Sequence, residues 1–207
     1  MSKVVRRKNK PKESKGFTYK DQYGLYGSKY ILRPIWSPIN VRVKLARMLL
    51  KFSFNGKSID CSQTTLLCSG HVYAGHLMIK ELAECFPSVE SVIGMDPVGF
   101  ALASSVSTMS VLSNFHPLDA VFLTEKSLSG PLRKKSVVVL LTGAANVKET
   151  LSKVKKLKSI SNLKLMGVLS LINMQDGTEE ALRKARVKYQ TVYTKEQIIT
   201  DDVDLGL

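Results

Sequence analysis

Apolar residues along the chain fall into short continuous runs that alternate with segments of helical spacing. The runs at 91–94, 120–123, 136–141 and 165–172 are rich in aliphatic residues, which is typical of strands buried in a sheet, and 188–193 is predicted to be a final strand. Apolar residues recur three or four positions apart at 40–52, at 71–86, after residue 99, after residue 145 or 146, and at 178–185, which predicts helices. Strands and helices therefore alternate. The pattern predicts an α/β fold with a mainly parallel sheet flanked by helices, in which ligands bind at the carboxyl ends of the strands.

Two stretches depart from this simple alternation. Asn55-Gly56 is a turn signal, and the residues that follow to position 67 look like extended, β-rich chain. His76 falls on the apolar side of the helix predicted at 71–86. A histidine there is more often a hydrogen-bonded core residue than a catalytic one.

The segment from Gly94 to Gly99 joins a predicted strand to a predicted helix. Glycines allow the backbone to approach a ligand, and the first turn of a helix presents unpaired N–H groups to an anion. The segment is thus a candidate phosphate cradle. Phe100-Ala101 stands where a nucleoside-triphosphate P-loop needs Lys-Ser/Thr, so that motif is excluded. An ordinary tight connection between strand and helix is the alternative.

Length and composition suit one folded domain with a tail. The chain has 207 residues, of which 44% are hydrophobic and 23% charged, and no run reaches the roughly 18 apolar residues of a membrane span. We expect a flexible basic arm at 1–16 and a domain at 17–207. The three cysteines fit free thiols in a reducing, intracellular compartment, with the cytoplasm favoured and an organelle left open. The cysteines and histidines between Cys61 and His76 fit no common zinc spacing, so we expect no metal site.

Positive charge is concentrated in two places. The net charge is +14, and Met1–Lys20 and Arg133–Lys158 each contribute 8 − 1 = +7. A localised positive field attracts nucleic acid, an anionic membrane surface or phosphorylated ligands, although a solubilising tail and a solvated helix face would give the same counts. The candidate nucleic-acid contacts are Lys3, Arg6, Arg7, Lys8, Lys10, Lys12 and Lys15 in the arm, and Lys148, Lys155 and Lys156 in the helix after Asn146.

The order of these segments resembles the type I phosphoribosyltransferases, and among them the orotate phosphoribosyltransferases. Asn55-Gly56-Lys57-Ser58 is similar to the family's first hairpin, Gly94–Ala103 to its pyrophosphate loop, and the segment from Gly167 to Gly177 to its strand ending in Asp-Arg-x-x-Gly. The resemblance implies a sheet that ends in a further strand and a terminal helix, a homodimer, and a loop at Thr142, Gly143, Ala144, Ala145 and Asn146 that holds a phosphate.

Three departures affect the residues that the family's chemistry needs. The stretch from Val137 to Thr150 lacks the adjacent acidic pair that binds the ribose hydroxyls, and Asn173 replaces the aspartate of the Asp-Arg motif. The chain between Leu123 and Ser136 is too short for the mobile lid that covers pyrophosphate. Apolar side chains can neither orient a ribose diol nor stabilise positive charge at its C1 atom.

We therefore expect an orotate-phosphoribosyltransferase-like protein without catalytic residues or cofactor, which works as a binding or structural module and contacts RNA or DNA. One alternative is a divergent active phosphoribosyltransferase, which would need Mg²⁺. Another is an assembly protein whose basic arm docks on an acidic partner.

Overall fold

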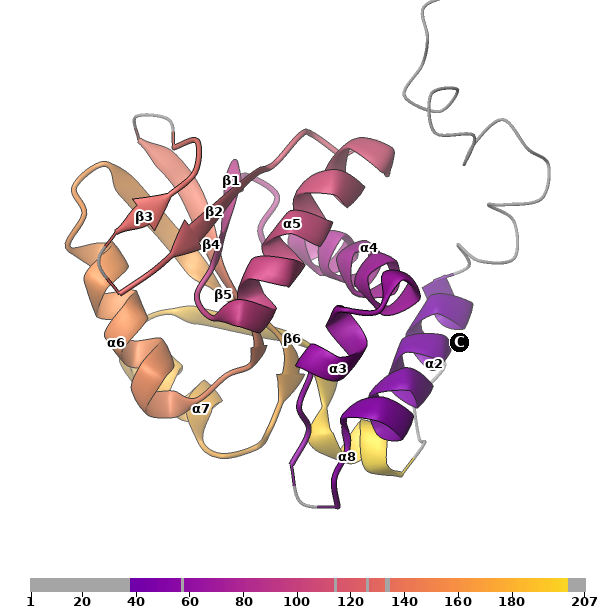
Figure 1. The fold of residues 1–207 in the computed structure, drawn as a ribbon. Helices are drawn as coiled ribbons and strands as arrows, with labels where there is room; N and C mark the ends of the chain where they lie inside the picture. Colours follow the sequence, from indigo (N-terminus) through magenta and orange to yellow (C-terminus); the bar gives the residue numbers. More distant parts are fainter. Residues whose placement is uncertain (1–37, 57, 114, 126, 133–134, 201–207) are drawn as a thin grey trace, which may run out of the picture.

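The computed structural model describes residues 38–56, 58–113, 115–125, 127–132 and 135–200, and the predicted arm at 1–16 lies outside them. Its strands form one six-stranded sheet in the order β3-β2-β1-β4-β5-β6 (Figure 1). Neighbouring strands are parallel except β2 and β3, which are antiparallel. The bounds are β1 Ser91–Gly94, β2 Asp119–Leu123, β3 Leu128–Ser129, β4 Ser136–Ala144, β5 Leu163–Asn173 and β6 Lys188–Thr194.

Strands β4 and β5 are the longest neighbouring strands of the sheet. Their register pairs Leu140 with Val168 and Leu141 with Leu169, and all four side chains are fully buried. A parallel strand covered by helices on both faces has no side facing water, so its apolar residues run without alternation. This explains the continuous apolar run at 136–141.

Helices cover both faces of the sheet. Helices α4 (Cys68–Cys85) and α5 (Pro97–Leu112) pack on one face, and α6 (Val147–Lys158) and α7 (Thr178–Lys184) on the other (Figure 1). Successive β5 side chains pack on opposite faces of the sheet. Leu169 belongs to the core under α4 and α5, whereas Val168 packs with Val154 of α6 and Leu182 of α7. The alternation of side chains along a strand thus divides the interior into two cores.

A smaller layer lies beside α4. It contains α2 (Pro38–Met48), the π-helical turn η1 (Leu49–Ser53), α3 (Ser62–Thr65) and α8 (Lys195–Ile199), which follows β6 (Figure 1). Arg42 of α2 donates a hydrogen bond to the carbonyl of Val192 in β6, and the Tyr193 hydroxyl donates to the carbonyl of Arg42 at 2.7 Å. These bonds fasten the start of the described chain to its last strand.

The predicted α/β class with a mainly parallel sheet is confirmed. The extended chain predicted up to residue 67 is wrong: past an isolated bridge between Phe54 and Ile59, the chain turns into α3. Local side-chain bonds explain the turn, because the Asp60 carboxylate accepts from the Ser62 N–H at 3.0 Å and the Thr65 hydroxyl donates to the Cys61 carbonyl at 2.9 Å. Among the described residues, no helix is long and apolar enough to cross a membrane.

Candidate functional site at the carboxyl edge of the sheet

The parallel strands all end at one edge of the sheet, and the candidate residues gather there. Strand β1 ends at Gly94, β4 at Ala144, β5 at Asn173 and β6 at Thr194. In open α/β sheets this edge is where ligands bind.

The connection from β1 to α5 is organised by Asp96, which caps the helix. One carboxylate oxygen accepts from the Gly99 N–H at 2.6 Å, and the other accepts from the Thr142 hydroxyl at 2.5 Å. Pro97 occupies the first turn, where its missing N–H has no cost. The sequence prediction passed over Asp96, although Asp-Pro at the start of an apolar helix is a recognisable capping signal.

The two glycines of this connection are required by close packing of the chain on itself. A Cβ atom at Gly94 would lie 2.5 Å from the Gly99 carbonyl oxygen, and one at Gly99 would lie 2.4 Å from the Leu141 carbonyl oxygen. The N–H of Met95 donates to Leu141 at 3.1 Å, and that of Phe100 donates to Asp96 at 2.8 Å. These N–H groups, together with that of Gly99, are therefore engaged within the protein. The geometry alone explains both glycines without a ligand.

The five residues proposed as a phosphate loop divide between a strand and a turn. Thr142, Gly143 and Ala144 belong to β4, where Thr142 pairs with Ser170 and Ala144 with Ile172. Ala145 and Asn146 alone connect β4 to α6. The Asn146 side chain accepts from the Glu149 N–H at 3.2 Å and so caps that helix.

The stretch that resembles the family's acidic pair is apolar and enclosed. Val138, Val139, Leu141 and Thr142 are each 0% exposed. The carboxylate that contacts this stretch is Asp96, which accepts a hydrogen bond from the Thr142 hydroxyl. It comes from the preceding connection and not from β4.

Cys61 lies beside this edge as well. A Cβ atom at Gly143 would lie 3.1 Å from the Cys61 Cβ. Burial, followed by the charges of Asp60 and Asp96, raises the pKa of the Cys61 thiol to about 12. The thiol is therefore protonated at neutral pH and is a poor nucleophile or metal ligand.

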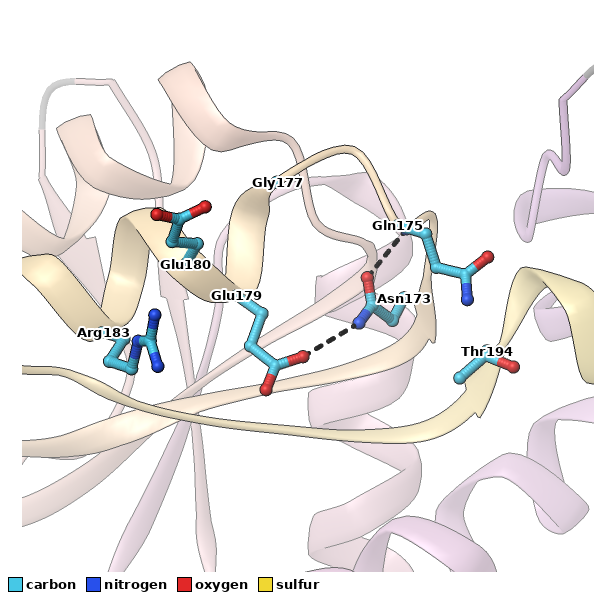
Figure 2. Close-up of a pocket in the computed structure, with 7 residues that line it drawn as sticks. All are labelled: Asn173, Gln175, Gly177, Glu179, Glu180, Arg183 and Thr194. Atoms are coloured by element: carbon cyan, nitrogen blue, oxygen red, sulfur yellow. Dashed lines mark hydrogen bonds between the residues drawn. The ribbon is translucent and has the colours of Figure 1, made fainter.

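An open pocket of about 450 Å³ lies where β5 and β6 end (Figure 2). The Asn173 side chain, 7% exposed, accepts from the Gln175 N–H at 2.9 Å and donates to Glu179 at 3.5 Å. Gln175 has a φ of 57°, a left-handed conformation that is uncommon for residues other than glycine. The polar lining comes from Asn173, Gln175, Gly177, Glu179, Glu180, Arg183 and Thr194. None of these was among the predicted site residues, although Asn173, Gln175 and Gly177 lie in the segment that resembles the family's motif, because the motif does not show which side of α7 faces the sheet.

The segment at the place of the family's lid is a tight hairpin between β2 and β3. The Thr124 N–H donates to the Ser127 carbonyl at 2.9 Å, and the Ser127 N–H donates to the Thr124 hydroxyl at 3.0 Å. The turn between the strands spans Thr124 to Ser127, so it cannot reach across the carboxyl edge as a long lid would.

The other candidate residues are spread over the surface. Lys148 and Lys155 are exposed on α6, whereas the Lys156 ammonium donates to the carbonyls of Thr124 and Glu125 at 3.0 and 2.7 Å. Lys156 therefore braces the β2–β3 turn. The seven candidate contacts in the arm, from Lys3 to Lys15, lie outside the described residues.

The histidine and cysteine candidates do not form a site with the residues above. Burial, followed by the charge of Lys80, lowers the pKa of His76 on α4. The three cysteines are free thiols. Within the described ranges, no three histidine, cysteine or acidic side chains converge in a way that could hold a metal ion.

Comparison with known proteins identifies one similar protein by sequence and several by structure. No known family profile matches the chain. An orotate phosphoribosyltransferase of Sorangium cellulosum is 29% identical over 155 residues, which are 70% of this chain and 79% of the relative.

Solved structures agree with that relative. The orotate phosphoribosyltransferase of Mycobacterium tuberculosis, in complex with inorganic phosphate, superposes with a TM-score of 0.65 at 19% identity, over 81% of this chain and 99% of that one. The orotate phosphoribosyltransferase of Aeropyrum pernix superposes with a TM-score of 0.60 at 20% identity, over 79% of this chain and 99% of that one. The sequence relative and the fold together show that this chain is similar to the type I phosphoribosyltransferases, and among them to the orotate phosphoribosyltransferases.

Proposed function

We propose that this protein keeps the orotate phosphoribosyltransferase scaffold but has lost catalysis, and that it works as a binding module. The observation that carries the proposal is the stretch of β4 where the family's acidic pair would stand. Val138, Val139, Leu141 and Thr142 are fully buried there, and none is a carboxylate.

A phosphoribosyl transfer needs groups that orient the ribose hydroxyls and stabilise positive charge as the bond at C1 breaks. Asp96 is a poor substitute, since both of its oxygens already accept hydrogen bonds from Gly99 and Thr142. The side chains at the end of β4 also offer no carboxylate for Mg²⁺, which prefers oxygen ligands of that kind. The short β2–β3 turn supports the same conclusion, because closure over a substrate excludes water from the reaction.

The test is Mg²⁺-dependent consumption of phosphoribosyl pyrophosphate with orotate or another base. We expect no turnover above the background without protein. Turnover that disappears in Thr142→Val, which removes the hydroxyl at nearly constant shape, would overturn the proposal.

An active, divergent phosphoribosyltransferase is the second candidate, favoured by the Sorangium relative, which is called an orotate phosphoribosyltransferase and of which 79% is covered. For this enzyme, Asp96 and Thr142 would have to take over the work of the missing pair. The same assay with Asp96→Asn separates the candidates, because turnover lost on removing this one charge would make Asp96 a catalytic carboxylate.

Anion binding at Gly94, Gly99 and Thr142–Asn146 is a separate part of the proposal. If the site still holds a phosphate, then phosphate should raise the melting temperature relative to chloride at matched ionic strength. Identical melting in the two salts would show that these segments are structural turns.

We further propose that the basic segments contact RNA or DNA. Exposed Lys148 and Lys155 on α6 support this, together with the charge of the arm. Deleting residues 1–16 should weaken binding and flatten its dependence on salt. Unchanged affinity would exclude the arm, and a chain that binds an acidic protein but no nucleic acid at low salt would favour an assembly role.

A homodimer, expected from the resemblance, would give twice the chain mass of 23.0 kDa in light scattering.

A further inference from the structure

Arg186 ends helix α7 in a conformation that favours glycine. Its φ is 54°, the Arg186 N–H donates to the Arg183 carbonyl at 3.0 Å, and the Val187 N–H donates to the Leu182 carbonyl at 2.9 Å. This pair of bonds is the Schellman motif, and Leu182 and Val187 make the apolar contact that accompanies it. The left-handed residue of that motif is usually glycine, because a Cβ atom is disfavoured there.

The stability of the fold therefore does not account for an arginine at this position. The residue is exposed, so its side chain adds little to the core. When a residue occupies a disfavoured backbone conformation, a functional reason for its side chain is worth seeking.

Other basic residues surround Arg186. The Lys158 ammonium donates to the carbonyl of Ala185 at 3.0 Å, which brings the end of α6 beside Arg186. Lys155 lies one turn before Lys158 on α6, and Lys184 forms an exposed ion pair with Glu180 at 2.9 Å. We call this group the basic end of the α6–α7 layer, and its members, all exposed, are Lys155, Lys158, Lys184 and Arg186.

Charge along this part of the chain is separated by position. Residues 148–188 contain ten basic and four acidic side chains, a net of 10 − 4 = +6. The four acidic ones, Glu149, Asp176, Glu179 and Glu180, lie in or before the first turns of α6 and α7, towards the carboxyl edge of the sheet. Lysines in a last helical turn also balance the helix dipole. That effect does not explain Arg186, since it lies outside the helix.

We propose that the basic end of the α6–α7 layer binds the phosphodiester backbone of nucleic acid. The proposal rests on the nucleic-acid binding proposed above and adds a surface on the folded body, distinct from the arm. Several cations within reach of one another neutralise consecutive phosphates, and a guanidinium can bind a phosphate through two hydrogen bonds. This gives the reason for arginine where glycine would be more stable. The surface lies at the opposite end of α6 and α7 from the carboxyl edge, so nucleic acid and a small ligand can bind together.

The decisive variant is Arg186→Gly in the full-length chain, because two readouts should move in opposite directions. Relief of the left-handed strain should raise the melting temperature by about 2–4 °C. Loss of one phosphate contact should weaken the binding of a single-stranded RNA or DNA oligonucleotide about fivefold and reduce the magnitude of the salt slope by about 1. Lys155→Gln, at an exposed position on α6, should weaken binding similarly.

The matched control is Lys80→Gln, which removes the same charge from an exposed site on α4. Its affinity should stay within twofold of the unmodified protein. An equal loss in Lys80→Gln would mean that only net charge matters, and the proposed surface would be wrong.

The remaining outcomes separate the two proposals. If Arg186→Gly and Lys155→Gln bind normally while deletion of residues 1–16 abolishes binding, the surface is excluded and the nucleic-acid function stands. If the unmodified chain binds neither RNA nor DNA at low salt, both proposals fail. If polyglutamate competes as strongly as RNA, the surface belongs to an acidic protein partner, and the proposal is wrong.

Discussion

At the scale of single residues, the glycines of this protein serve two different purposes. Gly94, Gly99 and Gly143 lie where chain segments touch, and a Cβ atom at any of them would lie 2.4 to 2.5 Å from a neighbouring atom. Gly56 and Gly177 have φ values of 88° and 87° with open space around them. The first group is needed for close approach and the second for a left-handed backbone.

This difference predicts different costs for the same substitution. Gly99→Ala should lower the free energy of unfolding by about 2–3 kcal/mol, because the added methyl group meets the rigid Leu141 carbonyl. Gly177→Ala should cost about 1 kcal/mol, the price of a left-handed alanine alone. Urea unfolding of both variants measures the difference, and equal losses would contradict the packing explanation.

Cys61 predicts a dependence of stability on pH. Its pKa in the folded protein is raised from 9.0 to about 12, so the folded state holds the thiol proton more tightly than the unfolded state. The associated stability is complete below pH 9 and is lost as the pH rises towards 12. Unfolding midpoints measured between pH 8 and pH 11 should fall, and Cys61→Ala should reduce that fall.

In the same native protein at pH 8, iodoacetamide should modify exposed Cys68 and leave Cys61 intact.

At the scale of elements, Asp96 joins a helix to a strand. Its carboxylate caps α5 through Gly99 and holds β4 through Thr142. Because Thr142 is fully buried, its hydroxyl needs an acceptor inside the protein.

Removing the carboxylate should therefore cost more than an ordinary helix cap. We expect Asp96→Ala to lower the free energy of unfolding by about 2–3 kcal/mol, as the sum of a lost cap and a buried hydroxyl without its best acceptor. Asp96→Asn keeps one acceptor oxygen and should cost about 1 kcal/mol or less. Denaturant unfolding compares the two, and similar losses would show that the charge and not the cap is what stabilises this connection.

At the scale of the whole molecule, Arg42 links the two ends of the described chain. Besides its bond to Val192, its guanidinium lies 3.8 Å from the Glu81 carboxylate, which in turn accepts from Gln190 at 2.9 Å. Helices α2 and α4 and strand β6 are thus held by one polar network.

Breaking that network should loosen the smaller layer from the sheet. Arg42→Leu should lower the free energy of unfolding by about 2 kcal/mol, the usual loss for a hydrogen-bonded charge that is partly buried. Lys44→Leu, at an exposed position on the same helix, should change it by less than about 0.5 kcal/mol. Hydrogen exchange of α2 amides should speed up in the first variant alone, and unchanged exchange there would mean that apolar packing holds α2 without Arg42.

The sequence by itself determined the class of the fold and the order of its elements. Buried parallel strands are recognised as continuous apolar runs, and helices by apolar residues that recur every 3.6 positions. Both patterns are local, so they can be read without knowing which elements pack together. The absence of acidic residues between Val137 and Asn146 is likewise a fact of sequence. The resemblance to the family's phosphate loop put Thr142–Ala144 in a loop, whereas β5 offers hydrogen-bond partners that extend β4 to Ala144.

Only the tertiary structure decided which residues meet. Asp96 and Thr142 are 46 positions apart, and Cys61 approaches Gly143 across the layers of the fold, so no spacing rule connects them. Lys158 and Arg186 are brought together in the same way, because α6 and α7 run side by side against one face of the sheet. Local periodic patterns in the sequence determine the helices and strands. A site forms where elements distant in sequence are packed together, and that packing follows from the burial of the whole core.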